Sequence, residues 1–442
     1  MARIFLASLA TQAACLQPGL STIPRHGRLT SGIGRTGAAS MNIVSTARLL
    51  FSDLVLKAQM QLDPEMELWK LPARDLIRSE EDIYTVAGAF PESVRAQFLD
   101  WYEGYKVQVT APQPHGPGLS EEELVVIFNR IIDRLILMKK QKFNFASRHE
   151  GIVEPYDYFE FGQEYVKPLI DFDKSWVRNP ELWEEASAAV KRGENVVLLA
   201  NHQSEADAAF LPLFFPEDKT LARDVYYVAG GRVVGDPLAQ PFSMGRNLFC
   251  VHSKKYIDIE TDAAQKKQMN TQNRRTLTEL SRAMKTGGVM IWLAPSGGRD
   301  RLTETEPRRP KPAGFDSAAV EMFRSIGEKS GKPTHLYPMA MATYSIMPPP
   351  DGRNKALGEK RVTKYTGIAV SLAPEVDTSD GAAWRPTPTG DAKADKELAA
   401  EAMTQHLFEQ VCAEYDVLEP VMADFEEPGY VPPNSAKPWV KA

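Results

Sequence analysis

Short apolar runs alternate with longer amphipathic stretches from about residue 146 onward, and this alternation constrains the fold more than any other feature. Strand-like runs are expected at 195–200, 224–229, 247–252, 289–294, 335–343 and 366–373. Helical spacing is expected at 181–192, 204–214, 261–285, 316–330 and 394–414. Such alternation is typical of an α/β layer. The sequence therefore predicts a mixed, largely parallel sheet flanked by helices over residues 146–442, with functional side chains at the carboxyl ends of strands.

Residues 53–145 carry helical spacing instead, in the segments 79–84, 91–102 and 120–140. The last segment is the clearest, because Ser120 and Glu123 form a capping box ahead of apolar residues at intervals of three and four. A stretch rich in proline and glycine separates it from the segment before. We expect a small N-terminal helical bundle here, ahead of the α/β domain.

The first 52 residues have the composition of a targeting peptide. They contain five arginines, no lysine and no acidic residue, together with many serines and threonines. An apolar stretch at 4–10 leaves room for a signal-like start of a two-part targeting sequence. A merely disordered N-terminus is the simpler alternative. We predict a disordered transit peptide at 1–52 that is removed from the mature protein.

Composition excludes several classes of protein. The 442 residues are 43% hydrophobic and 25% charged, with a net charge of −6, which is ordinary for a globular chain. No apolar run approaches the roughly 18 residues of a membrane span, and nucleic-acid binding is not expected without a basic face. The three cysteines, Cys15, Cys250 and Cys412, lack the spacing of a metal site or a disulfide framework. We expect a reducing compartment, no metal ion and no cofactor.

The segment NHQSEADAAF places His202 and Asp207 directly after the buried run 195–200. A histidine beside a carboxylate can take a proton from a hydroxyl, because the carboxylate fixes the imidazole tautomer and offsets the charge that forms. The competing interpretation is a capping box from Ser204 to Asp207, in which Asp207 merely bonds back to the start of its own helix. The motif alone leaves both interpretations open.

Two later apolar runs end in cations. The first ends in Lys254 and Lys255, and the second in Arg299, Asp300 and Arg301 behind a pair of glycines. If the second end is extended, both arginine side chains leave on one face, as a fork for a phosphate or carboxylate. The alternatives are solvated strand ends, with Asp300 paired to a neighbouring arginine.

Four blocks, in order, resemble the soluble plastid-type glycerol-3-phosphate acyltransferases, a family of His-x4-Asp glycerolipid acyltransferases. The blocks are NHQSEADAAF, GRNLFCVHSKK, IWLAPSGGRDR and LYPMAMATYSIMPPP, and further family-like stretches begin at Pro155, Val228 and Leu357. The resemblance implies an enzyme of the chloroplast stroma. It implies transfer of a fatty acyl group from an acyl carrier protein or coenzyme A thioester to the sn-1 hydroxyl of glycerol 3-phosphate, which gives lysophosphatidate.

The resemblance also implies site residues. The general base and its supporting carboxylate fall on His202 and Asp207. The family's phosphate pocket falls on Lys255, Arg299 and Arg301. A phosphomonoester carries a charge of about −1.5 to −2, which one lysine and two arginines can meet.

The chain departs from the family at Tyr256, where a histidine is usual, and has His252 where tyrosine is common. On an extended strand, positions 252 and 256 face the same side. We hypothesise that His252 or the Tyr256 hydroxyl supplies the lost phosphate contact. The alternative is that position 256 lies outside the pocket.

Two further features of the reaction leave choices open. Backbone N–H groups after Asn201, or in the turn at Gly297, are candidate donors to the oxyanion that forms on the thioester. Arg308, Arg309 and Lys311 could dock an acidic carrier protein, or could form a solvated loop.

Three other functions compete with this interpretation. Transfer to lysophosphatidate would use the same base and phosphate pocket, although that lipid acceptor normally requires membrane access. A metal-dependent phosphoester hydrolase would use His202, Glu205 and Asp207 as ligands, but the three are crowded on one short turn. A binding protein without turnover would follow if the change at Tyr256 weakened the pocket.

Overall fold

The computed structural model describes residues 43–113, 117–215, 218–236, 238–350, 361–431 and 433. Residues 1–42 of the expected transit peptide and the first residues of the family-like stretch at Leu357 lie outside this set. The chain divides into two compact units. One comprises residues up to 66, 74–103 and 120–133, and the other comprises 67–73, 104–119 and the chain from 134 onward. The domain boundaries at 52 and 145 stay predictions.

In the described part of the chain, four α-helices precede the first strand: α2 (Ile43–Leu62), α3 (Glu80–Gly88), α4 (Glu92–Thr110) and α5 (Glu121–Lys140). Helix α2 starts within the segment whose composition predicts a transit peptide. The capping box of α5 forms as predicted, since Ser120 Oγ accepts from Glu123 N at 3.3 Å and Glu123 Oε2 accepts from Ser120 N at 2.8 Å.

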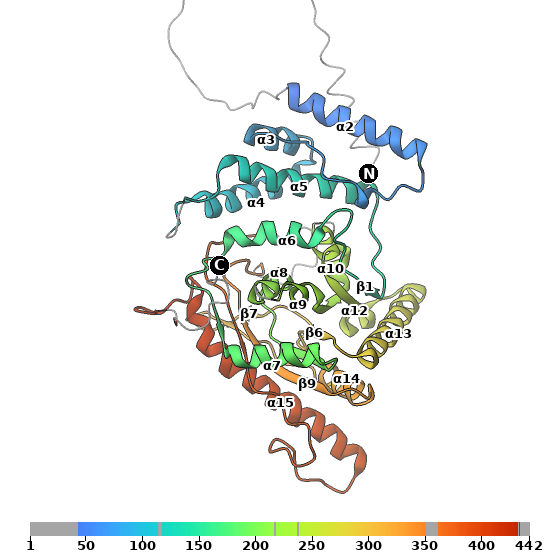
Figure 1. The fold of residues 1–442 in the computed structure, drawn as a ribbon, viewed down its shortest axis with the longest axis vertical. Helices are drawn as coiled ribbons and strands as arrows, with labels where there is room; N and C mark the ends of the chain where they lie inside the picture. The colour runs from blue at the N-terminus through green and yellow to red at the C-terminus, as the bar shows by residue number, and fades with distance from the viewer. Residues whose placement is uncertain are drawn as a thin grey trace, which may run out of the picture. The chain divides into compact units, whose positions relative to one another are not determined.

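A mixed sheet of eight strands forms the centre of the second unit, in the order β1-β5-β4-β6-β3-β9-β10-β2. Helices surround this sheet in Figure 1. The five strands from β5 to β9 are parallel, whereas β1 and β10 run antiparallel to their neighbours β5 and β9. The strands are β1 (Arg148–His149), β2 (Trp176–Arg178), β3 (Asn195–Ala200), β4 (Tyr226–Gly230), β5 (Asn247–Val251), β6 (Met290–Leu293), β9 (Thr334–Ala342) and β10 (Ala369–Leu372). The predicted fold class is confirmed.

Helices connect and cover these strands. They are α6 (Tyr158–Val166), α7 (Pro180–Lys191), α8 (Asp207–Phe210), α9 (Lys219–Asp224), α10 (Gly231–Gly235), α11 (Gln240–Met244), α12 (Lys254–Ile259), α13 (Ala263–Thr286), α14 (Ser317–Glu328) and α15 (Ala392–Leu418). A separate hairpin consists of β7 (Arg301–Leu302) and β8 (Pro310–Lys311). Across the residues that the structure covers, no helix is both long and apolar enough to cross a bilayer.

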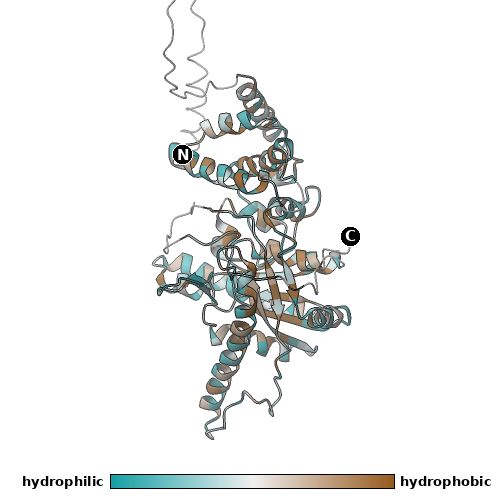
Figure 2. Ribbon diagram, turned by 90° about the vertical axis from the view of Figure 1, so that its left-hand side faces the viewer, coloured by the Kyte–Doolittle hydropathy of each residue, from teal (hydrophilic) through white to brown (hydrophobic). Residues whose placement is uncertain are grey.

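The hydrophobic core explains why β3 lies at the centre. All six of its residues are buried, and the central strands carry the hydrophobic colour in Figure 2. Val197 and Leu199 face a cluster that includes residues of α13, α14 and α15, while Val196 and Leu198 face the other side of the sheet. Each such side chain contributes about 1.5–3 kcal/mol when fully buried. This burial fixes the carboxyl end of β3, where His202 follows.

Two local predictions are wrong. The run expected to be extended through 252–256 ends as a strand at Val251, and α12 begins at Lys254, so the shared parity of 252 and 256 does not apply. The reason is Asn273, whose side chain bonds to both His252 N and His252 O and replaces a strand partner. The helix expected from 204 begins only at Asp207, because the amides of residues 203 and 204 bond to the Asp207 carboxylate instead.

Candidate active site

The candidate site lies at the carboxyl end of the parallel strands, where the loops after β3, β6 and β9 meet. His202 comes two residues after β3, Asp300 follows β6, and Thr343 comes directly after β9. Strands β6 and β9 are the two neighbours of β3 in the sheet. Three segments that are far apart in the sequence are therefore adjacent in space, as expected for the carboxyl edge of an α/β sheet.

His202 and Asp207 form a hydrogen-bonded pair. His202 Nδ1 lies 2.8 Å from Asp207 Oδ2. An ionised carboxylate only accepts hydrogen bonds, so Nδ1 donates and the lone pair is on Nε2. The ring of Trp292 packs edge-on against the imidazole, with 5.4 Å between the ring centroids. The His202 side chain keeps 23% of its surface exposed, so Nε2 is held in one orientation but remains open to a substrate.

The capping box from Ser204 to Asp207 does not form, because the helix begins at Asp207, but Asp207 still bonds to the loop before that helix. Besides His202, Asp207 Oδ2 accepts from Gln203 N at 2.8 Å and from Ser204 N at 3.2 Å. The other oxygen, Oδ1, accepts from the Thr343 hydroxyl at 2.6 Å. The carboxylate is 1% exposed, and four donors satisfy it in place of water. The bonds that shape the loop thus also orient the carboxylate toward the imidazole.

Two buried amides join this loop to the end of β9. Asn201 bonds to both backbone groups of Met341, accepting from its N at 2.8 Å and donating to its O at 3.0 Å. Gln203 Oε1 accepts from the backbone N–H groups of Thr343 and Tyr344. These side chains continue the β3–β9 ladder beyond its last backbone pair. They hold the loop that carries His202 rigid.

Asp300 joins the loop after β6, which carries Arg299 and Arg301, to the loop after β3, which carries His202. We call these the arginine loop and the histidine loop. Its backbone N–H donates to the His202 carbonyl at 2.5 Å. Its carboxyl accepts from Asn201 Nδ2 at 2.8 Å and from Ala313 N at 3.0 Å. Asp300 is fully buried. Its side chain therefore points into the protein and not outward, where an ion pair with a neighbouring arginine would form at the surface. Sequence reasoning missed this role, although alternation along an extended segment, with both arginines on one face, already places Asp300 on the other.

Burial raises the pKa of the Asp300 carboxyl to about 7, against the opposing effect of its two hydrogen-bond donors. The folded protein therefore holds a proton here that the unfolded chain releases near its ordinary pKa of about 3.9. Stability from this group falls as pH rises between these two values and then levels off.

We expect Asp300→Asn to gain stability relative to wild type as pH rises from 5 to 8. An amide cannot ionise, so the variant escapes the cost of a buried charge, which is at most about 4 kcal/mol for a shift of this size. The measurement is the free energy of unfolding in urea at both pH values, with the exposed Asp380→Asn as a control. A difference between variant and wild type that stays constant across this range would contradict the raised pKa.

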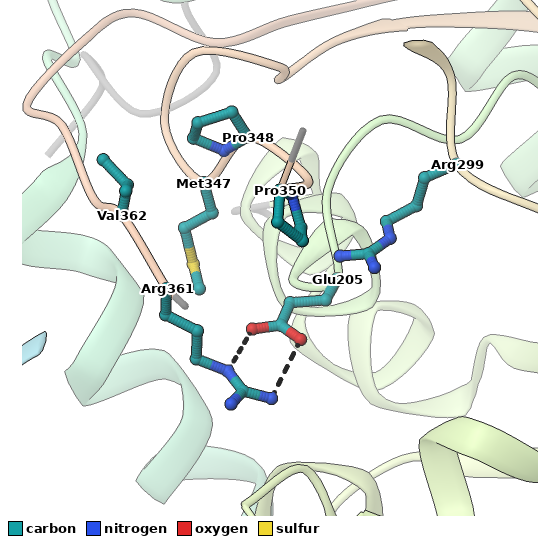
Figure 3. Close-up of a pocket in the computed structure, with 7 residues that line it drawn as sticks. All are labelled: Glu205, Arg299, Met347, Pro348, Pro350, Arg361 and Val362. Atoms are coloured by element: carbon teal, nitrogen blue, oxygen red, sulfur yellow. Dashed lines mark hydrogen bonds and ion pairs between the residues drawn. The ribbon is translucent and has the colours of Figure 1, made fainter. Parts of the chain in front are cut away.

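The two predicted phosphate-binding arginines flank Asp300 and lie at the surface of the site. Arg299 lines a pocket with Glu205, Met347, Pro348, Pro350, Arg361 and Val362 (Figure 3). Arg301 is exposed and donates to the Pro350 carbonyl at 3.3 Å. Because Asp300 N bonds to His202 O, the arginine loop touches the loop of the candidate base. The structure thus brings the loop that carries both arginines into contact with the loop that carries His202.

The other predicted phosphate ligands lie on β5 and α12. Strand β5 is separated from β3 by β4 and β6, which corresponds to about 14 Å between β3 and β5. His202 and His252 therefore belong to different parts of the carboxyl edge. His252 Nε2 lies 3.0 Å from Gln272 Oε1 of α13. Lys255 and Tyr256 fall within α12, where the Tyr256 side chain is exposed. Their roles in phosphate binding stay predictions.

The hydrogen bonds and ion pairs of the site bear on two earlier alternatives, the choice of oxyanion donors and the metal-dependent hydrolase. The backbone N–H groups of Gln203 and Ser204 already donate to Asp207, and Gly297 N donates to Ala294 O. These three groups are therefore not available to donate to an oxyanion. Within the described ranges, no group of three His, Cys, Asp or Glu side chains has a metal-binding arrangement. Glu205, which the hydrolase interpretation needs as a ligand, pairs with Arg361 instead.

Comparison with known proteins identifies a shared domain that contains His202, Asp207 and the two arginines. A family model described as acyltransferase matches residues 181–342, from α7 to the end of β9. The chain is 38% identical over 351 residues to a chloroplastic glycerol-3-phosphate acyltransferase of Cucurbita moschata, covering 78% of this chain and 75% of that protein. It is 37% identical to proteins of the same description from Arabidopsis thaliana and Spinacia oleracea, over 77% and 82% of this chain and 73% and 74% of theirs.

Proposed function

This chain belongs to the glycerol-3-phosphate acyltransferase family, and on that premise we propose that His202 takes the proton from the sn-1 hydroxyl of glycerol 3-phosphate. The hydroxyl oxygen then attacks the carbonyl carbon of a fatty-acyl thioester. The carbon–sulfur bond breaks, the leaving thiolate takes the proton from His202, and lysophosphatidate is the product. The protein is an acyltransferase of the plastid, because its relatives are named chloroplastic glycerol-3-phosphate acyltransferases.

The hydrogen bond between Asp300 N and the His202 carbonyl carries this proposal. Because His202 and the two arginines lie on touching loops, this bond supports a single site for one small molecule with a phosphate and a hydroxyl. Asp207 keeps His202 in the tautomer with a free lone pair on Nε2 and offsets the imidazolium charge. Arg299 and Arg301 hold the phosphate, which turns a collision of two substrates into a reaction between oriented groups.

Direct assay of the purified protein tests the reaction. We expect incubation with labelled glycerol 3-phosphate and an acyl thioester to give 1-acyl lysophosphatidate, and lysophosphatidate offered as acceptor to give little diacylated product. An acylated product from lysophosphatidate alone would favour the runner-up acyltransferase. The absence of any acylated product from an intact, folded sample would leave only a binding role.

The acyl donor is the second part of the proposal. Two of the three cations first considered for carrier docking form ion pairs, since Arg309 lies 2.9 Å from Glu419 and Lys311 lies 2.8 Å from Asp416. Helix α13 is a better candidate for the carrier-docking surface. It has six Lys or Arg residues and one Glu, although the whole chain has a net charge of −6. Lys266, Lys267 and Arg274 border a shallow surface there. We propose that this surface docks an acidic acyl carrier protein at the carboxyl edge of the sheet.

Charge reversal of Lys266, Lys267 and Arg274 to Glu tests carrier docking. We expect the KM for the acyl carrier thioester to rise about 10-fold or more at low salt, because each exposed pair contributes a few tenths to 1 kcal/mol. The KM for an uncharged acyl-pantetheine thioester should stay unchanged. An equal rise for both donors, or no rise for the carrier, would contradict docking on α13.

A further inference from the structure

Glycerol 3-phosphate presents three polar groups, and the site described so far meets two of them. In the proposed function, Arg299 and Arg301 bind the phosphate, and His202 contacts the sn-1 hydroxyl. The secondary hydroxyl lies between them and needs a hydrogen-bond partner, because a polar group enclosed without one loses binding energy. Glu205 is the candidate partner, because it follows His202 closely in the chain and lines a pocket with Arg299.

The position of Glu205 follows from the chain. It comes three residues after His202 in the loop between β3 and α8, and it lines the same pocket as Arg299. In Figure 3 the Arg299 side chain extends toward Glu205 from one side, and Arg361 faces the Glu205 carboxylate from the other. About 30% of the Glu205 side chain is exposed, so a ligand can reach it.

Arg361 fixes the orientation of this carboxylate. Its Nε lies 2.6 Å from Glu205 Oε1 and its NH2 group lies 3.2 Å from Glu205 Oε2, a two-pronged pair. Asp236 holds the same guanidinium at 3.3 Å, and only 12% of the Arg361 side chain is exposed. The two carboxylates raise the pKa of Arg361 against the effect of its burial. Arg361 therefore stays charged, and Glu205 cannot swing freely.

We propose that Glu205 accepts a hydrogen bond from the secondary hydroxyl of glycerol 3-phosphate, and that Arg361 is the residue that positions it. This inference rests on the proposed function. A carboxylate offers about four lone-pair sites and no donor, and Arg361 occupies two of them, so acceptor capacity remains for a hydroxyl. Glu205 thus selects a substrate that carries the secondary hydroxyl.

A substrate that lacks the secondary hydroxyl, 3-hydroxypropyl phosphate, tests the assignment. We expect wild type to prefer glycerol 3-phosphate by about 10- to 100-fold in kcat/KM, as for loss of a hydrogen bond to a charged group. Glu205→Ala should reduce this ratio to near one, because it slows the reaction of glycerol 3-phosphate and leaves that of the analogue almost unchanged. Arg361→Met should reduce the ratio partly, since Glu205 remains but loses its support.

Glu321→Gln is the matched control, because Glu321 pairs with Arg324 in the same two-pronged way on α14. It should leave the ratio at the wild-type value. A Glu205→Ala enzyme that still acylates glycerol 3-phosphate with the full wild-type preference would overturn the assignment while the proposed function stands. An equal loss for both substrates would also overturn it, because a merely structural role predicts that outcome. A wild type that acylates neither substrate would contradict the proposed function itself.

Discussion

His202→Ala is expected to lower kcat by about 10³-fold or more while the affinity for glycerol 3-phosphate stays within a few-fold of wild type. Positioned general bases contribute about 10² to 10⁴ to rate, and here the imidazole also orients the hydroxyl. The phosphate contacts lie on the neighbouring loop, so binding survives the substitution. Initial rates with an acyl thioester give kcat, and calorimetric titration with glycerol 3-phosphate gives the affinity.

His335→Ala is the matched control for this variant. His335 is also an imidazole between carboxylates, with Nδ1 at 3.0 Å from Glu375 and Nε2 at 3.2 Å from Glu194. It lies near the start of β9, away from the carboxyl edge of the sheet, and its removal should leave kcat within about two-fold, as for a residue outside the chemistry. If His202→Ala kept a tenth of wild-type turnover, another group would be the base.

Arg299→Ala should raise the KM for glycerol 3-phosphate by about 10- to 100-fold and leave the KM for the thioester almost unchanged. A hydrogen bond to a charged partner is worth about 1.5–3 kcal/mol, and the guanidinium faces the pocket that Glu205 also lines. Arg299→Lys should recover only part of the loss, because an ammonium lacks the planar fork. Steady-state kinetics with each substrate varied in turn measures both constants.

Arg308→Ala removes an arginine between the strands of the β7–β8 hairpin and provides the comparison. We expect its KM for glycerol 3-phosphate to match wild type, since the residue lies outside the pocket that Arg299 lines. If the KM for glycerol 3-phosphate rose equally in both variants, the loss of one positive charge from the molecule would explain the rise, and not the loss of a phosphate contact. An unchanged KM in Arg299→Ala would remove this residue from the phosphate site.

The sequence predicted the central strands well because their signal is local. Burial on both faces makes β3 a continuous apolar run, and the expected 195–200 is the observed Asn195–Ala200. The helices α13, α14 and α15 were located to within a few residues for the same reason, since each shows helical spacing over a long segment. The short strands β1 and β2 were missed, because two or three residues give no periodic pattern.

The supporting contacts of the site depend on tertiary structure and could not be predicted. Alternation could have placed Asp300 on the face opposite both arginines, but only the fold shows that it bonds to Asn201. Glu205 and Arg361 are 156 positions apart, and nothing in either segment indicates that they pair. At 252–256, contacts from α13 overrode the extended conformation that the apolar run suggested.

A crystal structure of the protein with glycerol 3-phosphate bound tests the central claim most directly. We predict phosphate oxygens within hydrogen-bond distance of the Arg299 and Arg301 guanidinium groups, and the sn-1 hydroxyl oxygen about 2.6–3.2 Å from His202 Nε2. A phosphate bound away from both arginines, with the hydroxyl out of reach of His202, would contradict the account.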